Sequence, residues 1–389
     1  MLDLLPTQRL TSTFRRFFDS EAHGAVLLIV CTAGSLLAAN SAIGPAYTAF
    51  WQSPVAGLTL EHWINDALMA VFFLLVGLEL ERELYVGELS DGRTALLPIL
   101  AAVGGVALPA GIHFALNAGL ASQAGMGIPM ATDIAFALGA LALLGSRVPA
   151  SLKVFLAALA VMDDLAAIVV IALFYTASLS YAYLAAATAV FAALVALNRL
   201  RVMSLVPYLA GGALMWLLMY KSGVHATIAG VLLAFTIPFG ARKDDETSPS
   251  HRLEHFLHRP VVLVVLPLFA LANTGIEIGG GAAAMFASAN SLGIIAGLLL
   301  GKPIGITLMA LLGVALGLSR LPADMRWSHV FGVGLLAGIG FTMSIFITNL
   351  AFAGDAQLIN ASKAAILAAS FAAGLCGLAW LAISLKRAS

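Results

Sequence analysis

Apolar stretches of roughly the length needed to cross a bilayer follow one another along almost the whole chain. Lipid allows only helices and closed barrels as spanning structures. These stretches are too long and too uniformly apolar for barrel strands, whose residues alternate in polarity. We therefore expect an all-α polytopic membrane protein with about twelve spans, at residues 24–41, 62–80, 95–116, 122–143, 153–174, 182–198, 204–219, 223–239, 256–273, 292–316, 328–350 and 359–385.

The remaining composition leaves no room for a soluble domain. Only 10% of the residues are charged, against roughly 25% in soluble proteins. The longest polar stretch, 240–259, is too short to fold alone, so we treat 1–389 as one transmembrane domain. A net charge of +0 suggests no nucleic-acid partner. Cys31 and Cys376 lie in apolar runs and indicate packing rather than a disulfide or metal framework, and no cofactor is expected.

Positive charge is distributed unevenly between the two sides. If the run at 24–41 is an uncleaved first span rather than a signal peptide, seventeen of the 20 lysines and arginines fall in loops on one side. Lys221 and Lys363 fall on the other side, and Lys302 lies inside a span. The positive-inside rule then places both termini in the cytoplasm.

Two spans carry interruptions near their middle. The fourth contains Pro129, Thr132 and Asp133, and the eleventh contains Gly338 and Gly340, followed by Thr342 and Ser344. Glycine lowers the cost of leaving the helix, and hydroxyl groups can satisfy freed backbone groups. The alternative is ordinary close packing through small residues. Gly293, Gly297 and Gly301 predict such close packing beside Lys302.

The interrupted spans occupy matching places. Each is the middle of three spans, within 95–174 and 292–385, and the two units begin on opposite sides of the membrane. Paired interruptions in corresponding units point to the binding site of a transporter. We expect inverted three-helix repeats with two discontinuous, crossing helices.

Four charged residues lie deep in the spans: Asp133, Asp163, Asp164 and Lys302. Ionisable groups at this depth usually mark an ion path or proton relay. Asp133 can offset the positive ends of broken helices or bind an ion directly, and Lys302 can offset negative ends or pair with an aspartate. Asp163 and Asp164 project about 100° apart on a helix, so both can border one cavity, though differently.

The adjacent aspartates suggest ion exchange. Burial and mutual repulsion both disfavour two ionised carboxyls, whereas a hard cation requires oxygen ligands. Protons and a cation therefore compete for the same oxygens, and competition at a site open to one side at a time is sufficient for exchange. If two protons replace one Na⁺, each cycle moves one charge. The second proton is carried by Asp163 or by Lys302. A purely structural role for the pair is the alternative.

Several titratable residues flank the spans. Glu79 closes the second span, and Glu254, His255 and His258 open the ninth span on the same side. Histidine titrates near neutrality, so this rim could sense internal pH or could be an ordinary solvated helix end. His225, at the outer start of the eighth span, is either a sensor or a capping residue.

Six motifs carry a resemblance to a known family: 63–79 (WINDALMAVFFLLVGLE), 131–139 (ATDIAFALG), 162–165 (MDDL), 221–227 (KSGVHAT), 301–303 (GKP) and 338–346 (GIGFTMSIF). From about residue 14 onward, the chain resembles the bacterial Na⁺/H⁺ antiporter A family.

The resemblance implies proton-driven efflux of Na⁺ or Li⁺ through the bacterial inner membrane. It also implies the roles of individual residues and a homodimer formed partly through a hairpin, here in the short segment 42–61. By this likeness the ion- and proton-binding pair is Asp163 and Asp164. Asp133 and Lys302 are the compensating charges beside the crossed, unwound helices, and Thr132 lies at the unwound stretch of the fourth span, as Gly338 and Gly340 lie at that of the eleventh. The residues of the pH response are Glu79, His225, Glu254, His255 and His258.

Three rival functions deserve comparison. A Na⁺-coupled symporter or a cation channel would also place acids in the membrane. An intramembrane aspartyl protease needs two acids that converge to share a proton, and adjacent residues on one helix cannot face each other in this way. We therefore expect a transporter rather than an enzyme.

Overall fold

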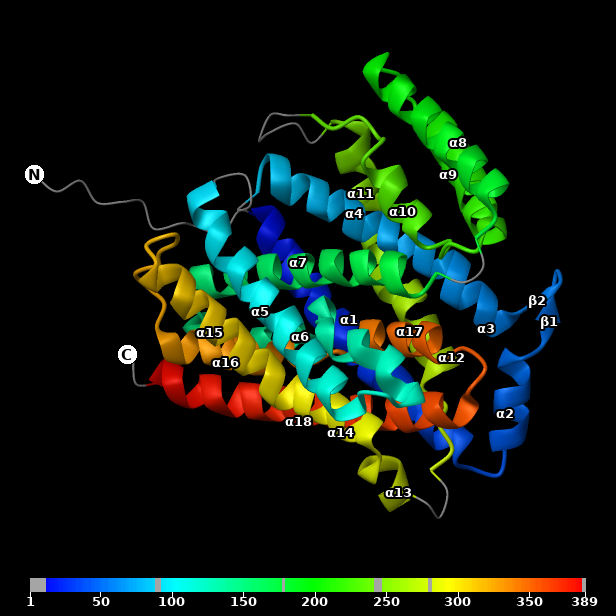
Figure 1. Cartoon of the computed structure of the whole chain (residues 1–389). Helices are drawn as coiled ribbons and strands as arrows, with labels where there is room; N and C mark the ends of the chain where they lie inside the picture. The colour runs from blue at the N-terminus through cyan, green and yellow to red at the C-terminus, as the bar shows by residue number, and fades with distance from the viewer. Residues whose placement is uncertain (1–11, 88–91, 177–178, 241–246, 279–281, 387–389) are drawn as a thin grey trace, which may run out of the picture.

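The structure, a computed structural model, describes residues 12–87, 92–176, 179–240, 247–278 and 282–386 (Figure 1). The α-helices in this part of the chain are α1 (Ser12–Ala39), α2 (Gly44–Trp51), α3 (Leu60–Trp63), α4 (Met69–Tyr85), α5 (Gly92–Asn117), α6 (Ile134–Ala142), α7 (Ala150–Phe174), α8 (Tyr181–Arg199), α9 (Leu205–Ser222), α10 (Ile228–Ala234), α11 (Pro249–Pro260), α12 (Leu266–Asn273), α13 (Ala282–Ala287), α14 (Ala289–Ala296), α15 (Lys302–Ala315), α16 (Trp327–Ala337), α17 (Phe341–Ala351) and α18 (Ala356–Lys386).

Shorter elements join these helices. Two-residue strands β1 (Pro54–Val55) and β2 (Leu58–Thr59) form a small antiparallel hairpin between the first two spans. Its turn places Ala56 and Gly57 at φ of 50° and 87°, the left-handed region that a tight hairpin turn requires. The other connecting elements are 3₁₀ segments at Ala121–Met130 and Gly145–Arg147 and π-helical segments at Ile64–Leu68, Val261–Val265 and Gly297–Gly301.

The predicted all-helical membrane class agrees with the structure. Seven helices in the described part of the chain are long and apolar enough to cross a membrane, or up to ten if each of three bent helix pairs is one span. α9 and the seven-residue α10 are outside this tally, although both fall in predicted spans. The count of twelve therefore stays a prediction.

The fourth and eleventh predicted spans are each broken. Ala121–Met130 and α6 are bent by 41° around residues 131–133, and α16 and α17 are bent by 47° around residues 338–340. Both breaks are extended or irregular backbone at Thr132, Asp133, Gly338 and Gly340, which the sequence singled out, whereas Pro129 lies just before the first break in the 3₁₀ segment. The breaks leave backbone groups that need partners inside the protein.

Prolines account for two of the π-helical segments. Pro303 and Pro267 have no backbone N–H, so the carbonyls of Leu299 and Leu263, four residues earlier, lose their usual helical partners. Each of these two carbonyls lies within a π-helical segment, where the widened turn changes the hydrogen-bond pattern. Lys302, the first residue of α15, directly follows the widened turn at Gly297–Gly301.

Small residues bring α15 and α14 against α5, as the glycine spacing predicts. A Cβ atom on Gly104 would overlap the backbone of Gly305, and one on Gly305 would overlap Gly104. Cβ atoms on Gly297 and Gly301 would press on Pro129 and Pro109, at 2.7 and 2.9 Å. These close approaches fix the position of Lys302 along the bundle.

The site-bearing helix α7 runs through the interior of the bundle (Figure 1). In the most apolar 18-residue stretch of α7, 61% of the residues are buried, whereas in that of α8 only 11% are. α8 and α9 pack on each other at one edge of the molecule, where α9 also contacts α10. α7 is therefore enclosed by protein, while α8 leaves most of its surface exposed.

Candidate functional site

The two helix breaks meet at Asp133, in the centre of the bundle. The backbone N–H of Asp133 donates to the carbonyl of Ile339 at 2.7 Å. Its carboxylate accepts from the N–H of Phe136 at 3.1 Å, from the N–H of Thr342 at 3.1 Å and from the Thr342 hydroxyl at 2.6 Å. Asp133 thus lies at the N-terminal, positive ends of both α6 and α17, the position from which a carboxylate offsets helix dipoles.

Asp163 is held by a lysine and a hydroxyl. Lys302 Nζ lies 2.5 Å from Asp163 Oδ2 and 2.6 Å from Thr132 Oγ1. The Thr132 hydroxyl lies 2.6 Å from Asp163 Oδ2 and 3.0 Å from the carbonyl of Ala337, and its single hydrogen can serve only one of them. Asp163, Lys302 and Thr132 are fully buried.

Asp164 has different surroundings, although it is the next residue. It is 1% exposed, and its Oδ1 is buried without a hydrogen-bond partner in the described part of the chain. It borders a cavity of about 40 Å³, which exceeds the roughly 10–15 Å³ that one water molecule needs. The lining residues are Phe72, Leu75, Val76, Glu79, Thr132, Asp133, Ile134, Ala135, Asp164, His258, Val261, Val262, Leu266, Thr342 and Met343.

The two adjacent aspartates therefore do not border the cavity together. The rotation of about 100° between neighbouring helical residues turns Asp163 toward Lys302 and away from the lining. Asp163 Oδ1 is also buried without a hydrogen-bond partner among the described residues. Each carboxyl thus has one oxygen that no described group satisfies.

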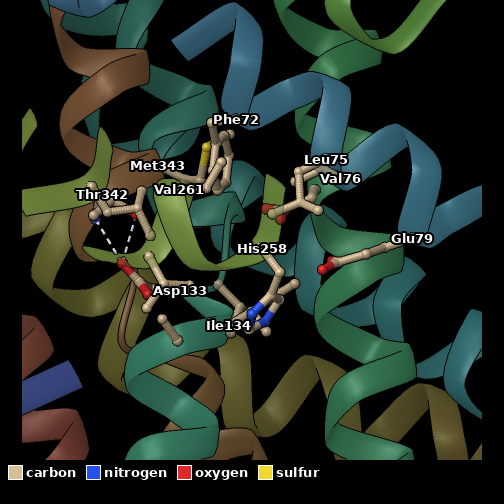
Figure 2. Close-up of a pocket in the computed structure, with 15 residues that line it drawn as sticks. Phe72, Leu75, Val76, Glu79, Asp133, Ile134, His258, Val261, Thr342 and Met343 are labelled. Carbon is tan, nitrogen blue, oxygen red and sulfur yellow. Dashed lines mark hydrogen bonds between the residues drawn. The ribbon is translucent and has the colours of Figure 1, made fainter. Parts of the chain in front are cut away.

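Glu79 and His258 form another part of the cavity wall. In Figure 2 their side chains extend toward each other from opposite sides, away from the Asp133–Thr342 pair. Glu79 is 7% exposed and His258 is half-buried. The cavity therefore joins Asp164 to two of the residues that the sequence assigned to a pH response.

The other predicted pH-response residues lie elsewhere. Glu254 forms an ion pair with Arg82 at 3.2 Å, which ties α11 to the end of α4. His255 is exposed and does not line the cavity. His225 is half-buried, and its Nε2 lies 2.7 Å from the carbonyl of Tyr175 just after α7.

Gly338 and Gly340 are required by space at the second break. A Cβ atom on Gly338 would overlap the carbonyl oxygen of Leu298, and one on Gly340 would overlap the Ser344 hydroxyl. That hydroxyl donates to the carbonyl of Ile128 at 2.6 Å, next to the first break. A side chain at Gly338 would therefore push the eleventh span away from Leu298, and one at Gly340 would displace the hydroxyl that links the two broken spans.

Thr342 is the functional residue whose role the sequence analysis missed. It was noted only as part of an interruption, yet it supplies both the N–H and the hydroxyl that hold Asp133. The signal was present: a hydroxyl residue directly after Gly340 and Phe341 occupies the first turn of a half-helix, where side chains can reach partners across the break.

Comparison with known proteins places the chain in a family. A family profile described as Na⁺/H⁺ antiporter 1 matches residues 15–381. The chain belongs to the Na⁺/H⁺ antiporter 1 family. A Na⁺/H⁺ antiporter NhaA of Dechloromonas aromatica is 67% identical over 374 residues, 96% of each chain. Those of Cytophaga hutchinsonii and Caulobacter vibrioides are 55% and 48% identical, over 97% and 99% of this chain and 97% and 94% of theirs.

Membership in the Na⁺/H⁺ antiporter 1 family confirms the resemblance that the sequence motifs indicated. It agrees with the apolar helices in identifying a multi-pass membrane protein that takes part in ion transport by Na⁺/H⁺ exchange. The buried carboxylates described above are the features of this antiporter that require a functional explanation.

Proposed function

We propose that the protein exports cytoplasmic Na⁺ or Li⁺ in exchange for external protons, with two H⁺ entering for each cation. The observation that carries this proposal is Asp164, whose Oδ1 has no partner among the described residues and which borders a cavity large enough for water or an ion. An unsatisfied buried carboxylate is costly unless a cation or a proton occupies it during the cycle.

The cation site is assigned to oxygens already present. Na⁺ is a hard cation that takes oxygen ligands, and Asp164 and Asp163 each hold one unpartnered Oδ1. Thr132 supplies a hydroxyl next to Asp163. A cation between the two carboxylates would weaken the hold of Asp163 on Lys302, because the same negative charge cannot serve both cations fully.

The same competition supplies the protons. In the cation-free protein one proton neutralises Asp164, and the ammonium of Lys302 neutralises Asp163 through their ion pair. Cation binding displaces both, and the freed Lys302 loses its proton in the dry interior. Two protons against one Na⁺ move one charge per cycle, so a membrane potential drives the exchange by about 2.3 kcal/mol per 100 mV. If Lys302 keeps its proton, Asp163 is the second carrier.

Asp133, Gly338 and Gly340 are assigned to the frame rather than to ion binding. Asp133 is bonded to the N-terminal ends of two half-helices, so it stabilises the broken spans on which alternating access depends. We also propose that residues 95–174 and 292–385 are inverted repeats, because each contains one broken span and the two breaks hydrogen-bond to each other.

Regulation and assembly complete the proposal. Glu79 and His258 line the cavity, so their charge would tune proton and cation access with internal pH. Glu254 and His255 lie on α11 together with His258, and His225 lies beside the C-terminal end of α7.

We place both termini in the cytoplasm and the chain in the bacterial inner membrane. The β1–β2 hairpin exposes Val55, which suits pairing with a second copy in a homodimer.

None of the three rival functions fits the site as well. A protease would need Asp163 and Asp164 to share one proton, yet Asp163 is paired with Lys302 and Asp164 faces the cavity. A symporter or channel would move Na⁺ without counter-moving protons. The competition of cation and proton for the same two carboxylates favours exchange.

Proteoliposomes test the proposal directly. Adding Na⁺ outside vesicles that hold an acid-inside pH gradient should collapse the gradient, and an imposed potential should change the rate. The KM for Na⁺ should fall as pH rises, because fewer protons compete. Na⁺ uptake with an unchanged proton gradient would instead establish a symporter or channel.

A further inference from the structure

Three asparagine side chains meet between membrane-spanning helices, away from the aspartate cavity. Asn65 lies in the π-helical segment before α4, Asn273 is the last residue of α12, and Asn349 lies in α17. We propose that these three residues, the amide cluster, are the outer gate of the transport path. The cation leaves between their three helices, and the cluster closes that route in this structure. This inference rests on the proposed exchange of Na⁺ for protons.

The side chains of the amide cluster hold each other across helix boundaries. Asn65 and Asn273 exchange two hydrogen bonds, in which each amide nitrogen donates to the other amide oxygen, at 3.2 and 2.7 Å. The amide nitrogen of Asn349 donates to the same Asn273 oxygen at 2.6 Å. Asn273 is 1% exposed, and the other two residues are half-buried. Amides in apolar surroundings need hydrogen-bond partners, and here each of them finds one on another helix.

The helices that carry the amide cluster also form part of the wall of the aspartate cavity. Phe72, Leu266 and Met343 line the cavity, and each lies six or seven residues from the asparagine of its own span. Six or seven residues correspond to roughly two turns, or about 10 Å, of a helix. The excess of lysine and arginine assigns the start of the second span and the ends of the ninth and eleventh spans to the outer side. The amide cluster therefore lies outward of the cavity along the same helices.

Three phenylalanine rings from these helices separate the cavity from the amide cluster. Phe269 and Phe346 lie between the cavity-lining residue and the asparagine of their own helices, and Phe73 comes from α4. The centroid of the Phe346 ring lies 5.5 Å from that of Phe73 and 6.5 Å from that of Phe269. All three residues are at most 1% exposed. Closely packed rings exclude water, so the path is shut at this level as well.

The bond between Asn349 and Asn273 joins parts of the protein that must move apart. α17 belongs to the proposed repeat 292–385, whereas α12, which lies beside it in Figure 1, is outside both proposed repeats. Alternating access moves one such unit against the rest of the protein around a fixed site. Outward opening therefore separates the two amides. Once apart, they can bind water and offer oxygen ligands to the passing Na⁺, which an apolar contact cannot do.

Thiol labelling tests the gate without any measurement of transport. Cys31→Ser and Cys376→Ser remove the native thiols, and Phe72→Cys then places one thiol in the cavity wall. A membrane-impermeant thiol reagent is added on the outer side of right-side-out vesicles. Asn273→Leu, which keeps the approximate volume but removes the bonds of the amide cluster, should raise the labelling rate by about tenfold, because hydrogen bonds are lost from the closed state alone.

Another asparagine on the outer side provides the matched control. Asn40 bonds to the backbone of Ile276 and Ile278, just after α12, and does not belong to the amide cluster. Asn40→Leu should leave the outside labelling rate unchanged. Asn349→Leu removes only the bond to the neighbouring α12 and should raise the rate by a smaller factor, which keeps the test decisive if Asn273→Leu folds poorly. Labelling from the cytoplasmic side should persist in every variant, which shows that the cavity is still formed.

A cross-link across the gate tests its part in transport. Asn273→Cys and Asn349→Cys are combined in the protein without native thiols and joined by a short bifunctional reagent that reduction can cleave. Exchange in proteoliposomes should stop when the link forms and should return on reduction. A lack of exchange in the unmodified protein would contradict the proposed function, and the labelling experiment would still decide whether the amide cluster is a gate.

Two results would overturn the proposal. One is an outside labelling rate that is the same in Asn273→Leu, in Asn349→Leu and in Asn40→Leu. The other is undiminished exchange by the fully cross-linked protein, because a gate that cannot open must stop the cycle.

Discussion

Asp133 and Asp164 are both carboxylates in the interior of the bundle, both are at most 3% exposed, and both border the same cavity. Asp133 accepts hydrogen bonds from Phe136 and Thr342, whereas Asp164 Oδ1 has no partner among the described residues. A buried charge that the fold satisfies contributes to structure, while one that the fold leaves unsatisfied is available for a ligand.

Asp163 is intermediate between these two. One of its oxygens is held by Lys302 and Thr132, and the other has no partner in the described part of the chain. In the proposed cycle this ion pair is exchanged, because the transported cation replaces the lysine at the carboxylate. The comparison therefore predicts three different outcomes when the three carboxylates are changed.

The largest expected effect is on transport by Asp164→Asn. The amide cannot take up and release a proton, and it binds Na⁺ far more weakly than a carboxylate, so exchange should fall by at least about 100-fold. Because the lost carboxylate has no described partner at Oδ1, the melting temperature should be unchanged or slightly higher. Proteoliposome fluxes and thermal unfolding measure the two quantities, and turnover near that of the unmodified protein would remove Asp164 from the site.

The next largest effect is on stability, by Asp133→Ala. This change leaves the N–H groups of Phe136 and Thr342 and the Thr342 hydroxyl without their acceptor inside the protein, at a cost of about 3 kcal/mol or more. The melting temperature should fall clearly below that of Asp164→Asn. Asp133→Asn, which keeps an acceptor oxygen, is the matched control and should recover part of the loss. Equal melting of Asp133→Ala and Asp164→Asn would contradict the comparison.

Lys302→Gln distinguishes a proton carrier from a structural cation. Removing the ammonium leaves Asp163 as an uncompensated buried charge, which should cost about 3 kcal/mol of stability. Adding Asp163→Asn removes that charge and should restore most of the stability. If Lys302 carries the second proton, any exchange that remains in Lys302→Gln moves no net charge, and an imposed potential no longer affects its rate. A rate that still responds to potential would assign the second proton to Asp163.

The sequence anticipated some of these features and missed others for physical reasons. Adjacent aspartates in an apolar run, and glycines at a mid-span break, are local patterns that a single segment displays. The pairing of Thr342 with Asp133 and of Lys302 with Asp163 joins residues 209 and 139 positions apart. Such pairings depend on how the broken spans pack, so the sequence left Asp163 and the helix ends open as partners for Lys302.

The sequence also did not reveal where the helices widen into π-helical turns. The π-helical turns before Lys302 and after Pro260 arise where prolines remove backbone donors, but a proline by itself does not reveal whether a helix kinks or widens. The number of spans is difficult to predict for a similar reason. A short helix such as α10 depends on its neighbouring helices and cannot be recognised as a span by its own length.

A smaller effect is expected at the close approach of α5 and α15, because this contact holds the two helices together and involves no buried charge. Gly305→Ala places a methyl group into the backbone of Gly104 and should lower the stability by about 1–3 kcal/mol, the usual cost of overpacking. Gly317→Ala is no suitable control, since its φ of 70° strains any side chain. Gly111→Ala on α5 has open space and should be neutral, so equal melting of the two variants would exclude close packing as the cause.

The smallest effect should separate His258 from His255. The two histidines lie three residues apart on one helix, but only His258 lines the cavity that reaches Asp164. His258→Ala should shift the pH profile of exchange by roughly half a pH unit, the influence of one charge across a hydrated space. His255→Ala, the matched control, should leave the profile in place. Equal shifts would mean that the histidines act through the general electrostatic field of the surface and not through the cavity. The contrast between satisfied and unsatisfied groups would then apply to the carboxylates alone.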